Sequence, residues 1–152
     1  MSAMHDISLW AWAAMALLAL AAIWDAKTGL VPDVILAPAC VLSLIGLILR
    51  GDPVAAAEAV GWSVLALGIV WITNEIWFRL FHRDALGMGD AKWTAVAVLA
   101  AGPFPAAVAW MLGSWLALFW IGGAWVLRRR LAVVHFAPFL LIGLFVGIVF
   151  FH

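Results

Sequence analysis

The stretch WTAVAVLAAGPFPAAVAWMLGSWLALFWIGGAWVLRRR, residues 93–130, decides how the apolar segments of this chain are counted. Between Lys92 and Arg128 it runs for 35 residues without a charge, interrupted by Gly-Pro-Phe-Pro at 102–105. At about 1.5 Å per residue, a helix over 93–101 reaches only about 13 Å, less than half of a hydrocarbon core of about 30 Å. Residues 105–127 are long enough to cross it. We therefore expect a short helix, a turn at Gly-Pro-Phe-Pro, and a long helix.

The composition indicates an integral membrane protein. Of 152 residues, 68% are hydrophobic and only 11% are charged, far from the usual makeup of a soluble domain. Residues 1–6 hold no Lys or Arg and the first apolar run ends in Trp24-Asp25, so we interpret that run as a helix rather than a cleaved signal peptide. The remaining crossing segments are predicted at 7–24, 30–49, 54–78 and 131–151. The expected fold is an all-α integral membrane protein, a six-segment helical bundle with a short fourth helix, forming one domain over 1–152.

The basic residues predict an orientation. Loops on the cytoplasmic side of a membrane collect Lys and Arg. With six segments, the first, third and fifth loops carry Lys27, Arg79, Arg83, Lys92 and Arg128 to Arg130, and the opposite side carries only Arg50. This distribution places those three loops in the cytoplasm and both termini outside.

Two other patterns concern packing. Trp24, Trp77, Trp93 and Trp125 fall near predicted helix ends, which is typical of an interfacial aromatic belt. Gly61 and Gly68 are spaced along one apolar segment, where small residues let helices approach closely.

The tripeptide Asp-Ala-Lys occurs twice, at Asp25 and at Asp90, each time beside an apolar helix on the predicted cytoplasmic side. Ionisable groups at membrane depth are rare and usually functional. Gly87 and Gly89 allow close approach of another segment, and Asp90 is placed to cap the following helix. Taken alone, each Asp is equally well explained as a helix cap or an interfacial charge.

Taken as a pair, the two carboxylates suit hydrolysis. Two carboxylates held together cannot both ionise cheaply, so the pair holds a single proton. The ionised group can take a proton from water while the protonated group donates to a scissile carbonyl, without metal or cofactor.

Other chemistries find little support. Cys40 is the only cysteine and lies inside an apolar run, no Gly-x-Ser-x-Gly occurs, and the four histidines lack metal-ligand spacing. His82 and His135 are interpreted as interfacial polar residues. The zero net charge suggests no nucleic-acid partner. We expect no cofactor and no metal.

The motifs WDAKTGLVPD (24–33) and LGMGDAKW (86–93) resemble those of the prepilin peptidase family, bacterial membrane aspartic proteases of the GxGD type. The matching residues are Asp25, Gly29, Pro32 and Asp33 in the first motif, and Gly87, Gly89, Asp90 and Lys92 in the second. HFAPFLLIG (135–143) is similar to the start of the family's last helix, although the family usually has Pro at the position of His135. Larger members of that family carry a Cys-rich domain. Because this chain has a single cysteine, it resembles the compact members associated with Flp or tight-adherence pili, which lack that domain.

The resemblance implies an aspartic endopeptidase of the bacterial cytoplasmic membrane, with Asp25 and Asp90 catalytic at the cytoplasmic face. It implies removal of the basic leader from type IV or Flp-type prepilins or pseudopilins. Asp33 and Asp84 are candidate contacts for that leader. The expected partners are the prepilin, the lipid bilayer, and a homo-oligomer or the pilus-assembly machinery.

Three alternatives remain at this stage. A presenilin-like intramembrane protease would have Tyr-Asp at 24–25 and Pro-Ala-Leu near the C-terminus, and neither is present. A small proton-coupled transporter would place its carboxylates near the membrane midplane, often with related halves. A non-catalytic pilus-assembly factor would not depend on either aspartate.

Overall fold

The computed structural model describes residues 8–82, 87–127 and 134–151, and within them it has six helices and no strand. The helices are α1 (Leu9–Thr28), α2 (Asp33–Leu49), α3 (Pro53–Phe81), α4 (Met88–Ala101), α5 (Pro103–Val126) and α6 (Ala137–Phe151). α1, α3 and α5 are each long and apolar enough to cross a membrane, and α2 and α6 are shorter apolar helices. The chain is therefore an all-α membrane protein with a short fourth helix, as predicted.

The turn at Gly-Pro-Phe-Pro is a single residue in the structure. α4 ends at Ala101, Gly102 has φ 92°, and Pro103 opens α5. Proline fits the first turn of a helix, where its missing N–H costs nothing, and glycine accepts the positive φ. The chain thus reverses between α4 and α5 without a loop, so α5 begins earlier than predicted.

The predicted starts of the second and the last helix were early, and proline accounts for both. The second helix begins at Asp33 rather than at residue 30, because Pro32 is its N-cap. Residues 134–136 are not helical, and α6 begins at Ala137, directly before Pro138. A proline at or just before the first turn of a helix costs no hydrogen bond, so this position is favoured, although α2 also contains Pro38 in its interior.

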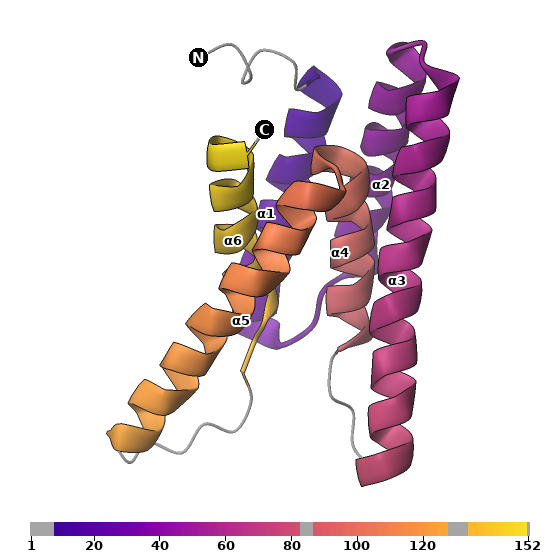
Figure 1. The fold of residues 1–152 in the computed structure, drawn as a ribbon. Helices are drawn as coiled ribbons and strands as arrows, with labels where there is room; N and C mark the ends of the chain where they lie inside the picture. Colours follow the sequence, from indigo (N-terminus) through magenta and orange to yellow (C-terminus); the bar gives the residue numbers. More distant parts are fainter. Residues whose placement is uncertain (1–7, 83–86, 128–133, 152) are drawn as a thin grey trace.

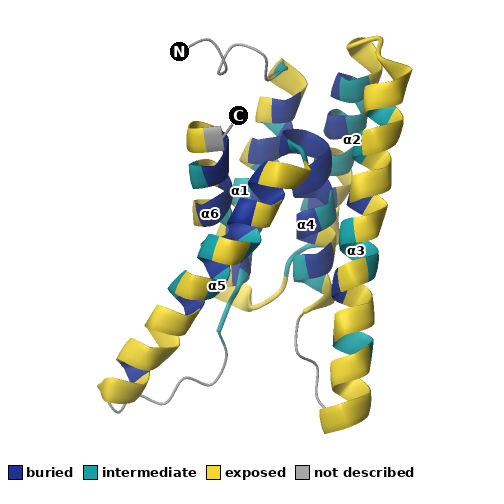
Figure 2. Cartoon of the chain, in the orientation of Figure 1, coloured by how far each residue is buried: buried dark blue, intermediate teal, exposed yellow. Residues whose placement is uncertain are grey.

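α4 lies at the centre of the bundle and packs against each of the other five helices (Figure 1). Nine of its residues are buried, including Trp93, Val96 and Ala97, and Figure 2 shows dark blue along much of α4. A helix that is apolar all round is expected in a core. Its 14 residues do not span a membrane, and its burial depends on its neighbours.

Close helix contact occurs on α6, not where the sequence indicated it. A Cβ added at Gly143 would lie 2.7 Å from the Ala109 carbonyl oxygen of α5, and one at Gly147 would lie 2.9 Å from Pro105. No atom comes within 4 Å of a Cβ added at Gly61 or Gly68. The prediction for Gly61 and Gly68 was therefore wrong, and the glycines of α6 let the backbones of α5 and α6 touch.

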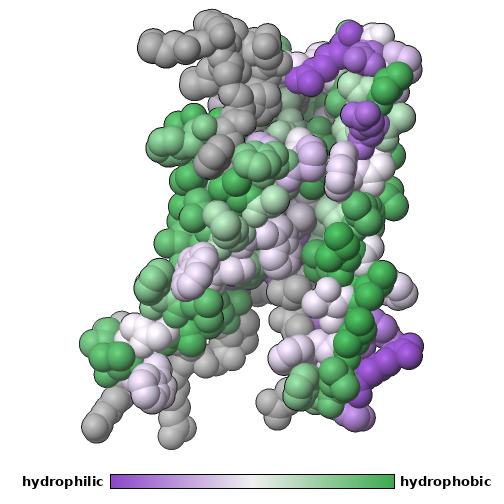
Figure 3. Space-filling view, viewed as in Figure 1, coloured by the Kyte–Doolittle hydropathy of each residue, from purple (hydrophilic) through white to green (hydrophobic). Residues whose placement is uncertain are grey.

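The outer surface is apolar over long stretches. Trp62, Val64 and Ile69 on α3 are at least half exposed, as are Trp115 and Phe119 on α5. Figure 3 shows this apolar surface over α3 and α5, with hydrophilic side chains gathered toward the ends of α3. Such a surface suits contact with lipid.

Trp93 does not belong to the aromatic belt. Its side chain is 1% exposed and its indole N–H donates to the Leu18 carbonyl at 3.1 Å, whereas Trp24, Trp77 and Trp125 are exposed. The prediction for Trp93 was wrong because Trp93 lies on the part of α4 that is buried among the other helices. It links α4 to α1 near the end of the bundle that carries both aspartates.

Candidate active site

The end of α1, the start of α4 and the residues before α6 meet at one end of the bundle (Figure 1). α1 begins and α6 ends at the opposite end. Asp25, Asp90 and His135 therefore share one end of the molecule, although they are far apart in sequence.

Asp25 lies within the last turn of α1, which continues to Thr28 rather than ending at Trp24. Its side chain is only 5% exposed, and its Oδ2 atom is buried with no hydrogen-bond partner in the described part of the chain. The backbone amide of Ala137 and the side chain of His135 both act on this carboxyl group. A buried carboxylate oxygen without a partner is costly, which is typical of a functional site.

α1 ends at a residue with a left-handed backbone conformation, which glycine adopts more easily than other residues. Gly29 has φ 73° and donates its N–H to the Asp25 carbonyl at 2.7 Å. This glycine cap turns the chain into residues 30–32, and the Pro32 carbonyl then accepts hydrogen bonds from the Ile35 and Leu36 amides of α2. The conformation of the first motif is thus set by Gly29 and Pro32.

Asp90 lies in the first turn of α4 and is half-buried. It does not cap the helix, contrary to the sequence prediction. The N-cap is Gly87, and no side chain donates or accepts a capping hydrogen bond there. The carboxylate instead lies beside Gly87, where an added Cβ would be 3.5 Å from Oδ2. The helix N-terminus nevertheless provides partial positive charge near this group.

The two motifs are packed directly against each other. A Cβ added at Gly89 would lie 2.8 Å from the Val31 Cβ, a distance that real Cβ atoms do not reach. The Lys92 ammonium also binds both oxygens of Asp33 at 2.8 Å. The chain at Val31 comes so close to Gly89 that a larger residue there would clash. Lys92 joins the second motif to the first through its ion pair with Asp33.

The two aspartates interact electrostatically. Asp90 lies on α4, which is not among the helices long enough to span a membrane. Burial, and after it the charge of Asp25, raises the pKa of Asp90 to about 7, while the Gly87 amide opposes this effect. Two carboxyl groups in this relation can share one proton near neutral pH.

Not every predicted residue can be placed. Asp84 lies outside the described residues, as do the basic residues Arg83 and Arg128 to Arg130. Asp33 is exposed and paired with Lys92, whereas Asp25 is buried.

Two residues of this region were not predicted from the sequence to lie beside the aspartates. His135 packs against Gly29, and Trp93 anchors α4 to α1. The position of Trp93, three residues after Asp90, signals proximity to the motif, but its indole bond depends on tertiary structure.

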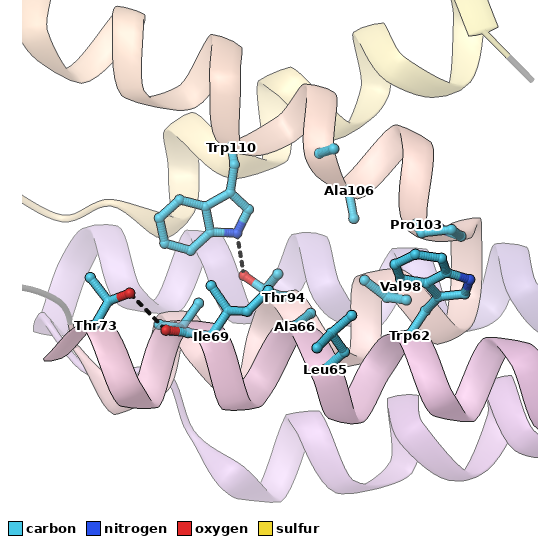
Figure 4. Close-up of a pocket in the computed structure, with 12 residues that line it drawn as sticks. Trp62, Leu65, Ala66, Ile69, Thr73, Thr94, Val98, Pro103, Ala106 and Trp110 are labelled. Carbon is cyan, nitrogen blue, oxygen red and sulfur yellow. Dashed lines mark hydrogen bonds between the residues drawn. The ribbon is translucent and has the colours of Figure 1, made fainter. Parts of the chain in front are cut away.

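An apolar cavity of about 510 Å³ lies between α3, α4 and α5 (Figure 4). Trp110 points into it and donates its indole N–H to Thr94 at 2.8 Å, and Thr94 donates to the Asp90 carbonyl at 2.7 Å. No titratable side chain is among its described lining residues. The cavity therefore adjoins the helix that carries Asp90, but the carboxyl groups of Asp25 and Asp90 lie at the end of the bundle.

A family model described as the type IV leader peptidase family matches residues 12–152. No curated protein and no solved structure matches the chain significantly. The matched region contains both aspartate motifs and all six helices except the first turn of α1.

Proposed function

Since the chain belongs to the type IV leader peptidase family, we propose that it is a membrane-embedded aspartic endopeptidase whose catalytic pair is Asp25 and Asp90. The observation that carries the proposal is the electrostatic interaction of these two aspartates, one of them with a buried, unpartnered oxygen. Few structural roles explain two mutually repelling carboxyl groups brought together from separate helices.

The reaction proceeds by activation of water. The ionised carboxyl group accepts a proton as the water oxygen attacks the scissile carbonyl, and the protonated carboxyl group donates its proton to the carbonyl oxygen. A proton then passes to the peptide nitrogen, the C–N bond breaks, and a carboxylic acid and an amine leave. The pair regains its single proton.

We propose that the substrate is a type IV or Flp-type prepilin or a pseudopilin, cut between its basic leader and its apolar helix. The distribution of Lys and Arg supports a cytoplasmic position for the end of the bundle that carries the aspartates, with both termini outside. The chain would then reside in the bacterial cytoplasmic membrane, with the prepilin helix in the same bilayer. A homo-oligomer or the pilus-assembly machinery is its further expected partner.

The test of this proposal is direct. The purified protein in lipid vesicles is mixed with a purified Flp-type prepilin, and the product masses are measured. We expect a single cut that releases the basic leader. An intact prepilin, with the peptidase folded and the substrate inserted, would refute the proposal and favour a transporter or an assembly factor.

The rate of cleavage should depend on pH, because catalysis needs the proton that Asp25 and Asp90 share. Because the pKa of Asp90 is about 7, the proton held by the pair is lost as the pH rises through that value. We therefore expect kcat/KM to fall on the alkaline side of neutrality, by about tenfold for each further pH unit. Initial rates across pH check this, and a rate that keeps rising well above neutrality would contradict it.

Asp33 is our proposed contact for the basic residues of the leader, together with Asp84. Lys92 partly neutralises Asp33, so its attraction for a leader is weaker than that of a free carboxylate. We expect Asp33→Lys to raise KM several-fold with little change in kcat. The exposed pair Glu75 and Arg79 on α3 offers a control in Glu75→Lys. Unchanged KM in Asp33→Lys would remove Asp33 from the substrate site.

A further inference from the structure

The first turn of α4, which carries Asp90, is weakly held by its own residues. Its N-cap is Gly87, and no described side chain makes a capping hydrogen bond there. Gly87 and Gly89 add backbone freedom, and the end of a helix frays readily because its first amides have no partner within the helix. A fixed position for Asp90 therefore depends on tertiary contacts.

Thr94, one helical turn after Asp90, supplies such a contact. Its hydroxyl donates to the Asp90 carbonyl at 2.7 Å and accepts the indole N–H of Trp110 at 2.8 Å (Figure 4). The Thr94 residue is 3% exposed, so water does not compete for these bonds. Because the hydroxyl donates to one partner and accepts from the other, its orientation is fixed, and two hydrogen bonds tie the Asp90 backbone to α5.

Trp110 extends from a part of α5 that is itself fixed. A Cβ added at Gly143 on α6 would lie 2.7 Å from the carbonyl oxygen and 2.8 Å from the Cα of Ala109, the residue before Trp110. Backbones packed this closely resist displacement. The indole N–H therefore reaches Thr94 from a rigid support.

Trp110 also contacts the segment that adjoins the other aspartate. Its ring packs against Phe136 with centroids 5.2 Å apart. The preceding residue, His135, lies beside Gly29, where an added Cβ would be 3.0 Å from the imidazole, and the Gly29 N–H donates to the Asp25 carbonyl. A continuous series of contacts through Trp110 thus joins the backbones of the two aspartates.

We propose that Thr94 and Trp110 are positioning residues of the peptidase. The Trp110 indole fixes the Thr94 hydroxyl, and this hydroxyl holds the uncapped turn of α4 so that the Asp90 carboxyl group stays in place relative to Asp25. Neither residue takes part in proton transfer. The inference rests on the proposed function.

The test compares kcat and KM for prepilin cleavage in wild type, Thr94→Val, Thr94→Ser and Trp110→Phe. Val keeps the shape of Thr without the hydroxyl, so we expect kcat to fall about tenfold with little change in KM. Ser keeps the hydroxyl and should retain most of kcat, whereas Trp110→Phe keeps an aromatic ring but loses the N–H and should lower kcat several-fold.

The same cavity provides matched controls on α3. The Thr73 hydroxyl donates to the Ile69 carbonyl at 2.7 Å, the same kind of bond one turn back along a helix, but no aspartate of the pair lies on α3. Trp62 lines the cavity as Trp110 does. Thr73→Val and Trp62→Phe should therefore leave kcat unchanged.

A double variant separates positioning from stability. Thr94→Val alone leaves the Trp110 N–H without this acceptor, which costs stability, but in the Trp110→Phe background no N–H is orphaned. Thr94→Val should therefore lower Tm less in that background than in wild type, while kcat of the double variant stays low. A kcat that recovers together with Tm would mean a merely structural role and would overturn the proposal.

The remaining outcomes are equally decisive. Thr94→Val with the kcat of wild type would overturn the inference and leave the proposed function standing, provided that wild type cleaves prepilin. An equal loss of kcat in Thr73→Val would overturn it too, because any threonine of the cavity would then matter alike. A folded wild type that cleaves no prepilin would remove both the proposed function and this inference.

Discussion

Replacing either Asp25 or Asp90 with Asn is expected to reduce the rate of leader removal by about 10²- to 10⁴-fold. Asn has nearly the shape of Asp but neither accepts a proton from water nor donates one as an acid. The buried Asp25 oxygen has no hydrogen-bond partner among the residues that the structure describes, so an uncharged group at this position relieves a desolvation cost. Both variants should therefore fold at least as stably as wild type while losing activity.

The measurement is the fraction of prepilin processed in membranes, followed by mass, with the level of each variant checked in the same membranes. Asp52→Asn is the matched control, because Asp52 caps α3 at the opposite surface through the Val54 and Ala55 amides and Asn caps equally well. Full processing by Asp25→Asn or Asp90→Asn would contradict the two-aspartate mechanism.

Gly89→Ala is expected to cost about 10²-fold or more in kcat/KM, although Ala is favoured over Gly within a helix. The added methyl would lie 2.8 Å from Cβ and 3.0 Å from Cγ2 of Val31. Either α4 or residues 30–32 must shift, which moves Asp90 relative to Asp25. Overpacking of this kind also costs about 1–3 kcal/mol of stability.

A second substitution separates this explanation from a general loss of folding. Val31→Gly removes both atoms that the new methyl would meet, so Val31→Gly with Gly89→Ala should recover part of the lost activity. Gly61→Ala is the matched control, because no atom lies within 4 Å of its added Cβ. An active Gly89→Ala variant, or a double variant no better than the single one, would show that this contact does not position the pair.

The count of helices was predictable because it depends on length, charge and proline. Gly102 and Pro103 end one helix and begin the next, and the short segment before them could not span a membrane alone. Which glycines bring helices together was not predictable. Gly61 and Gly147 both lie in apolar helices, but only the packing of α5 on α6 determines which one meets a backbone.

The aspartate pair was predictable because carboxylates beside apolar helices are few, and glycines flank one of them. The contact of His135 with Gly29 was not predictable, because it joins positions more than a hundred residues apart. Asp90 was expected to cap α4, but the N-cap is Gly87, three residues before Asp90, because the helix begins at Met88. The burial of Trp93 likewise could not be predicted, because it depends on how α4 packs against the other five helices.

The central claim is that Asp25 and Asp90 form one catalytic unit, and the double variant Asp25→Asn with Asp90→Asn tests it most directly. Residues that act as a unit give strongly non-additive losses, because removing the second changes little once the first is gone. We predict that the double variant cleaves prepilin about as slowly as the more impaired single variant. A double variant slower by the product of the two single losses would mean that the aspartates act independently and would contradict the account.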